Sequence, residues 1–148
     1  MSEPPVFVVG YRLGPTGLAA LGYARWLAEA VNGRLRVVHV TDLDDYPVDP
    51  DDLDWEAGAE HRLAAVRSEV EAALASYLGE WAYETAHGDP GDALADIAVR
   101  QDAELVVIAS HVEGRIGRLH RLVARSIVRE LFDRAECPVL VVPCRENR

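Results

Sequence analysis

ELVVIASHVEGRIGRLHRLVARSIVR, residues 104–129, is the stretch that predicts the centre of the fold. It begins with an unbroken apolar run over residues 105–109, which is typical of a strand covered on both faces of a parallel sheet. A polar, arginine-rich segment with Gly114 and Gly117 follows, and apolar residues return at helical spacing over residues 122–131. The unit is therefore a strand, a glycine-containing loop and a helix. Because ligands of open α/β sheets bind at the carboxyl ends of the strands, we expect a ligand crevice at this loop.

The length and charge of the chain narrow the classes of protein to consider. The 148 residues are enough for one core, and we expect a single domain over residues 1–148. The net charge of −10 argues against nucleic-acid binding by general electrostatics, because phosphate contacts need a basic face. The sequence contains neither an 18-residue apolar span nor a basic and then apolar leader. It therefore predicts no membrane anchor and no secretory signal, and we expect a cytoplasmic protein.

Strand-like and helix-like patterns alternate along the rest of the chain. Asp89 is placed to cap a helix that has Pro90 at its first position. Residues 42–54, DLDDYPVDPDDLD, are too charged and too broken for a core and predict an exposed loop; a calcium-binding loop would need a glycine and a closing glutamate that are missing. This alternation predicts one α/β layer sandwich. The expected strands are residues 6–10, 35–40, 82–86, 105–109 and 139–142, and the expected helices are residues 15–31, 63–77, 90–98 and 122–131.

Five segments, spread over nearly the whole chain, resemble the universal stress protein family. They are VVGYRLGPTGLAAL at 8–21, RLRVVHV at 34–40, HGDPGDAL at 87–94, AELVVIAS at 103–110 and ECPVLVVP at 136–143. The resemblance implies a three-layer α/β sandwich of the adenine nucleotide alpha hydrolase-like type, whose five-stranded parallel sheet has the order 3-2-1-4-5 with helices on both faces. In that order the first and fourth strands are neighbours where the winding reverses, which is where a crevice opens.

Some members of this family bind ATP and others do not. In the binders, an aspartate ends the first strand. The loop after the fourth strand carries a glycine, two residues, a glycine, nine residues, and then a glycine followed by serine or threonine. Glycine matters at these positions because backbone N–H groups can approach phosphates only where no side chain intervenes.

This chain departs from the ATP-binding pattern at three positions. Arg12 stands where the aspartate is expected, Ala109 stands at the strand-end glycine, and Arg125 replaces the glycine before Ser126. Standard ATP binding should be impaired, because the Arg125 side chain would project where phosphates meet bare backbone. The alternative is that Arg12 and Arg125 contact phosphate themselves, since guanidinium groups suit phosphate geometry.

The resemblance also implies the remaining residues of the crevice. It places Gly10 at the end of the first strand, the backbone of Val40 against adenine, and the hydroxyls of Ser110 and Ser126 near ribose or phosphate. Ser126 is equally compatible with an ordinary first-turn residue of a helix. The glycines of the phosphate loop would be the two that an apparent insertion has shifted, namely Gly114 and Gly117.

No catalytic constellation emerges from the sequence. His39, His61 and His87 lie in three separate elements, and neither a G-x-S-x-G motif nor any lysine accompanies them. His39 lies in an apolar strand and is interpreted as a hydrogen-bonded core histidine rather than a general base. We therefore do not expect an enzyme, and the alternative is limited to the slow nucleotide hydrolysis or autophosphorylation that the resemblance allows for some relatives. ATP is a candidate cofactor only for a member with an arginine-modified phosphate site.

The last apolar run predicts an edge strand that other chains can pair with. The resemblance implies that this strand pairs with its symmetry mate, and a twofold interface is also the commonest oligomeric arrangement. The sequence thus predicts a homodimeric stress-response protein that does not use ATP in the standard way. An ATP-binding switch with an arginine-modified phosphate site is the alternative. The residues expected at the dimer interface are Val139, Leu140, Val141 and Val142.

Overall fold

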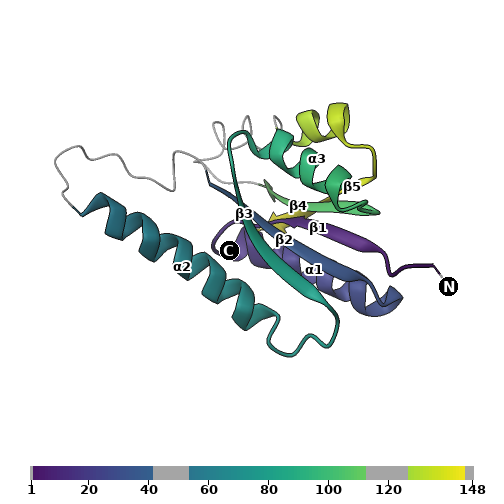
Figure 1. The fold of residues 1–148 in the computed structure, drawn as a ribbon, viewed down its shortest axis with the longest axis horizontal. Coiled ribbons are helices and arrows are strands. Elements are labelled where there is room, and N and C mark those ends of the chain that lie inside the picture. Colours follow the sequence, from purple (N-terminus) through teal and green to yellow (C-terminus); the bar gives the residue numbers. More distant parts are fainter. Residues whose placement is uncertain (1, 42–53, 113–126, 146–148) are drawn as a thin grey trace.

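A five-stranded parallel sheet forms the centre of the protein in a computed structural model that describes residues 2–41, 54–112 and 127–145 (Figure 1). The strand order β3-β2-β1-β4-β5 confirms the predicted fold class. β1 and β4 are paired in parallel although β2 and β3 lie between them in the sequence, so the winding reverses at this pair. The strands are β1 (Val6–Gly10), β2 (Arg34–Thr41), β3 (Trp81–His87), β4 (Leu105–Val112) and β5 (Val139–Arg145).

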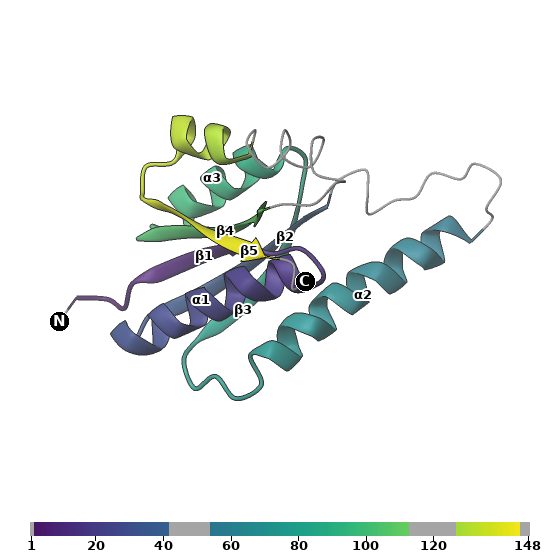
Figure 2. The same ribbon diagram turned by 180° about the vertical axis from the view of Figure 1, so that it is seen from behind.

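Helices cover both faces of the sheet. α1 (Pro15–Val31) and α2 (Trp55–Ala73) lie on one face, and α3 (Pro90–Arg100) lies on the other beside the helical residues 127–134 (Figures 1 and 2). Right-handed crossovers that run in opposite directions from a central strand place their helices on opposite faces, which accounts for this division. The protein therefore has the predicted three layers.

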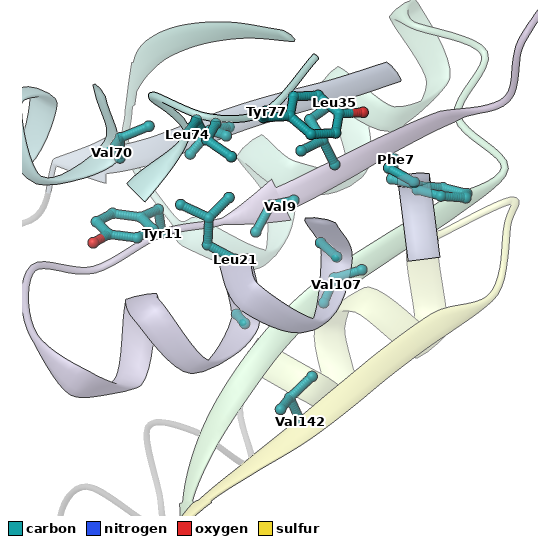
Figure 3. Packing of buried hydrophobic residues seen from close by; sticks show 14 of the residues in the cluster. Phe7, Val9, Tyr11, Leu21, Leu35, Val70, Leu74, Tyr77, Val107 and Val142 are labelled. Carbon is teal, nitrogen blue, oxygen red and sulfur yellow. The ribbon is translucent and has the colours of Figure 1, made fainter. Parts of the chain in front are cut away.

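Alternate residues of the central strands supply two separate cores. On β1, Phe7 and Val9 pack with α1 and α2, whereas Val8 packs with α3. Figure 3 shows the first of these clusters. Neither Val106 nor Val107 on β4 retains any exposed surface, which confirms that the apolar run is a strand buried on both faces.

The helix boundaries follow the predicted signals at some ends and not at others. α1 begins at Pro15 and ends before Asn32, which adopts the left-handed conformation with φ 52°. α2, however, runs from Trp55 to Ala73 rather than over residues 63–77. Tyr77 lies beyond the helix end and is buried separately, with its hydroxyl donating to the Gly33 carbonyl at 2.8 Å.

Two predicted segments cannot be compared with the structure. Nearly all of the acidic loop, residues 42–53, and most of the loop after β4, residues 113–126, lie outside the described residues. Among the residues that are described, no helix is long and apolar enough to cross a membrane.

Candidate ligand crevice

The carboxyl ends of β1, β2 and β4 meet at one edge of the sheet. Gly10 ends β1 beside Val38 of β2, and Val9 pairs with Val107 two positions before Ala109. This edge brings together five of the predicted site residues, of which Arg12 is exposed and the other four are half-buried: Gly10, Arg12, Val40, Ala109 and Ser110. The other four predicted site residues lie outside the described part of the chain: Gly114, Gly117, Arg125 and Ser126.

Gly10 lies close to α3 and to the neighbouring strand β4. A side-chain carbon built on it would lie 2.9 Å from Leu94 Cδ1 and 3.1 Å from Ile108 Cγ2. The glycine therefore allows α3 to pack closely against the end of β1. This contact gives Gly10 a packing role at the base of the crevice.

The turn that follows β1 comprises residues 11–14. The backbone of its first residue, Tyr11, is held by two hydrogen bonds to β2. The Tyr11 N–H donates to the Val38 carbonyl at 2.8 Å, and His39 Nδ1–H donates to the Tyr11 carbonyl at 2.9 Å. A carbonyl can only accept, so Nδ1 of this buried histidine carries a hydrogen. The interpretation of His39 as a hydrogen-bonded core residue is confirmed.

Glycines allow this turn to lie tightly against α1. Gly14, which precedes the helix, has a φ of 102°, a backbone conformation that residues other than glycine rarely adopt. A side-chain carbon on Gly17 would collide with the backbone carbonyl of Arg12. The backbone at Arg12 is therefore packed directly onto the first turn of α1.

Glu69 of α2 is a residue of this site that sequence reasoning missed. Its Oε1 accepts hydrogen bonds from the Tyr11 hydroxyl and, at 2.8 Å, from the Gly14 N–H. Burial, and after it the hydrogen bond to Glu69, raises the pKa of the Tyr11 hydroxyl, so the phenol remains a neutral donor. Glu69 lies between the buried Val66 and Val70, and this position in the helix is its only signal in the sequence.

Arg12 is exposed, in contrast to its neighbour in the turn. Tyr11 is only 2% exposed. In the part of the chain that the structure describes, the Arg12 guanidinium has no ion pair or hydrogen bond. A cation in this position is available to an anionic group entering at the end of β1.

A second polar contact at the same edge joins β2 to β3. The Thr41 hydroxyl donates to the Ala86 carbonyl at 3.1 Å, so its oxygen accepts from His87 Nδ1–H at 2.5 Å. This pairing leaves Nε2 of the exposed His87 as the ring nitrogen directed away from Thr41. The contact fixes the end of the edge strand.

Three acidic residues gather at the start of α3. Ligand oxygens of Asp89, Asp92 and Glu130 lie within 4.8 Å of one another, a spacing that a metal ion could bridge. Asp89, however, caps the helix by accepting from the Asp92 N–H at 3.2 Å, and Asp92 pairs with Arg134 at 3.1 Å. A helix N-terminus also disfavours cations. These contacts explain the cluster as a helix cap.

The Asp89 carboxylate is stabilised in its charged form. A hydrogen bond from Glu130, with smaller contributions from the Asp92 and Gly91 N–H groups and the Arg134 charge, lowers the pKa of Asp89, and partial burial opposes this. Glu130 reaches the cap because Gly91 has no side chain: a carbon there would lie 2.7 Å from Glu130 Cβ. The cap therefore joins residues 127–134 to α3.

Comparisons with known proteins agree with the fold described above. The model of the universal stress protein family matches residues 6–143. A search of curated proteins gives no significant match.

Solved structures of universal stress proteins have the same fold. One in complex with cAMP is 23% identical, with a TM-score of 0.67 over 97% of this chain and 99% of its own. UspA from Lactobacillus plantarum is 18% identical, with a TM-score of 0.70 over 96% of this chain and 99% of its own. The universal stress protein from Archaeoglobus fulgidus in complex with dAMP is 18% identical, with a TM-score of 0.61 over 96% of this chain and 99% of its own.

The close approach of the turn to α1 can be tested with two glycines of the same helix. Gly17→Ala should lower the free energy of unfolding by about 1–3 kcal/mol, because the new methyl group forces the Arg12 backbone away. Gly22→Ala is the matched control: nothing lies within 4 Å of its added carbon, so the better helix propensity should stabilise by about 0.5–1 kcal/mol. Urea unfolding measures both, and equal effects of the two variants would contradict the close contact.

The helix cap at Asp89 predicts a pH-dependent contribution to stability. Asp89→Ala should cost about 1 kcal/mol at pH 7, the usual effect of removing an N-cap. The pKa of Asp89 is lowered by folding, so this contribution is present above the unfolded pKa of about 3.9 and is lost as pH falls through the lower folded value. Urea unfolding from pH 7 to pH 3 should show the gap closing, whereas the exposed Asp96→Ala control should show none. A gap of constant size would contradict the assignment.

Proposed function

Because the chain belongs to the universal stress protein family, we propose that it is a cytoplasmic stress-response protein that acts as a homodimer and does not use ATP in the standard way. The observation that carries this proposal is the position of β5 at the edge of the sheet. Its outer side has no partner strand among the described residues. An apolar edge strand offers unpaired N–H and C=O groups to a second copy.

The side chains of β5 suit such an interface. Three apolar side chains of β5 pack against one or the other core and remain only half-buried within one chain: Val139, Leu140 and Val141. The exposed part of these side chains would be buried if β5 met its symmetry mate. A twofold arrangement would use the same strand of both chains.

The residues at the crevice argue against standard ATP binding. The universal stress proteins that bind ATP are expected to end the first strand with an aspartate, and here the exposed Arg12 reverses the charge. Ala109 adds a side chain at a position where the ATP-binding pattern has glycine. Both changes oppose the contacts that the standard pattern supplies.

A nucleotide-binding switch with an arginine-modified phosphate site is the second candidate function. The exposed guanidinium of Arg12, without an ion pair in the described residues, favours it. Two structurally similar universal stress proteins were crystallised with nucleotides, namely cAMP and dAMP. Arg12 together with Arg125 would then supply charge-assisted contacts to phosphate.

Val141→Lys tests the dimer. A charge on the edge strand should prevent pairing with a second copy and yield a monomer by light scattering, with the fold checked by circular dichroism. Val99→Lys, at an exposed position of α3, is the matched control and should remain dimeric. A folded Val141→Lys protein of unchanged mass would refute β5 as the interface.

Equilibrium titration with ATP and magnesium tests the second function. Under the leading proposal the wild-type protein shows no saturable micromolar binding, and Arg125→Gly creates such binding because it removes the obstruction. Under the second candidate the wild type binds, whereas Arg12→Ala and Arg125→Gly both weaken binding. Arg67→Ala, which removes an exposed cation that pairs with Glu71 on α2, controls for the loss of charge.

A further inference from the structure

The turn of residues 11–14 is more tightly held than a connecting loop needs to be. Tyr11 is bonded through its N–H, its carbonyl and its hydroxyl, and the Arg12 carbonyl is packed against Gly17. Two side chains of the turn nevertheless face outward, the Arg12 guanidinium and the Leu13 side chain, the latter 42% exposed. A fixed backbone that presents a cation with no ion pair among the described residues is the arrangement expected of a positioned binding group.

The N-cap residue of α1 provides no side-chain hydrogen bond to the helix. Gly14 at its N-cap has no side chain to offer, and its first turn contains no acidic residue. α3, by comparison, is capped locally by the Asp89 side chain. At α1 the carboxylate comes from Glu69, 55 positions away on α2. Among the described residues, the carboxylate that accepts from the Gly14 N–H is therefore held by the docking of another helix.

α2 is docked beside α1 by a short set of contacts. Val66, Val70 and Leu74 are buried in the core of that face, and Arg25 of α1 donates to the Ala73 carbonyl at 2.9 Å. Glu69 lies between Val66 and Val70 and is itself half-buried. Since its Oε1 accepts from both ends of the turn, a shift of α2 would withdraw both hydrogen bonds at once.

We propose that Glu69 is a positioning residue that couples the docking of α2 to the conformation of the turn bearing Arg12. Undocking of α2 withdraws the acceptor of the Tyr11 hydroxyl and the Gly14 N–H, and with it two of the contacts that fix the turn. By reciprocity, an anion that binds Arg12 in the fixed turn stabilises the docked α2. The ligand half of this coupling rests on the nucleotide-binding candidate above, whereas the mechanical half rests on the contacts of Glu69 alone.

Hydrogen exchange of the full-length protein tests the mechanical half without any ligand. Glu69→Ala should accelerate exchange of the Gly14 amide roughly tenfold, because it removes a hydrogen bond to a charged acceptor. Tyr11→Phe should accelerate amide exchange across Val66 to Leu74 several-fold. Tyr11 lies outside α2 and phenylalanine fills the same space, so the effect would come from the lost hydrogen bond to Glu69. Glu71→Ala, on the exposed face of the same helix, is the matched control and should change neither segment.

The two variants separate coupling from a purely local effect. If Tyr11→Phe leaves the α2 amides unchanged, or if Glu69→Ala leaves the Gly14 amide unchanged, the coupling is refuted. Glu69→Gln offers a second check, because the amide oxygen still accepts: its effect on exchange should lie between those of the wild type and Glu69→Ala.

Adding ATP with magnesium tests the ligand half. In the wild type, bound ATP should slow exchange in α2, and this protection should be largely lost in Tyr11→Phe, which keeps only the Gly14 hydrogen bond to Glu69. Loss of the protection is not expected from a merely structural role of Tyr11. A wild type that binds no ATP refutes the ligand half together with the nucleotide-binding candidate, while the exchange experiment without ligand still decides the coupling itself.

Discussion

The parallel pairing of β1 with β4 is the contact on which the rest of the structure depends. Val8 and Val9 of β1 and Val106 and Val107 of β4 are fully buried, so both faces of this pair need a covering layer of helices. Because the chain crosses over from this pair in opposite directions, α1 and α3 lie on opposite faces, and the winding reverses between β1 and β4. The same pairing leaves β5 at the edge of the sheet.

The fold could be predicted from the sequence because β1, β4 and β5 each contain an uninterrupted apolar run between clear breaks. The strand order was implied by the resemblance of five segments to the universal stress protein family. Pro15 and the Asp89–Pro90 pair likewise identified two helix starts. The limits of α2 could not be predicted, because its first turns are largely polar and lack an apolar period. At the C-terminal end of α2, the spacing of Tyr77 matched the helical period although this residue lies beyond the helix. It is buried by the turn that follows α2, and its hydroxyl donates to the Gly33 carbonyl.

The candidate site could be predicted only where it consists of strand ends. Gly10, Val40 and Ser110 lie at one edge because carboxyl ends of parallel strands meet there, and this follows from topology. The contact of Glu69 with Tyr11 joins residues 58 positions apart. The sequence places Glu69 between Val66 and Val70, which indicates the inner side of the helix. It does not indicate the contact with Tyr11 and Gly14, which comes from the packing of α2 against the turn.

The turn after β1 therefore retains a carboxylate but gives it a different role. In the ATP-binding pattern of the family, the acidic group belongs to the turn itself and is available to a ligand. Here Arg12 occupies that position and faces solvent, while the carboxylate arrives from α2 and is used by Tyr11 and Gly14. Those two donors already occupy Glu69 Oε1, so among the described residues of the turn itself the outward-facing charge is that of Arg12. A cation there would complement an anionic group, which is the chemistry that the second candidate function requires and the leading proposal does not.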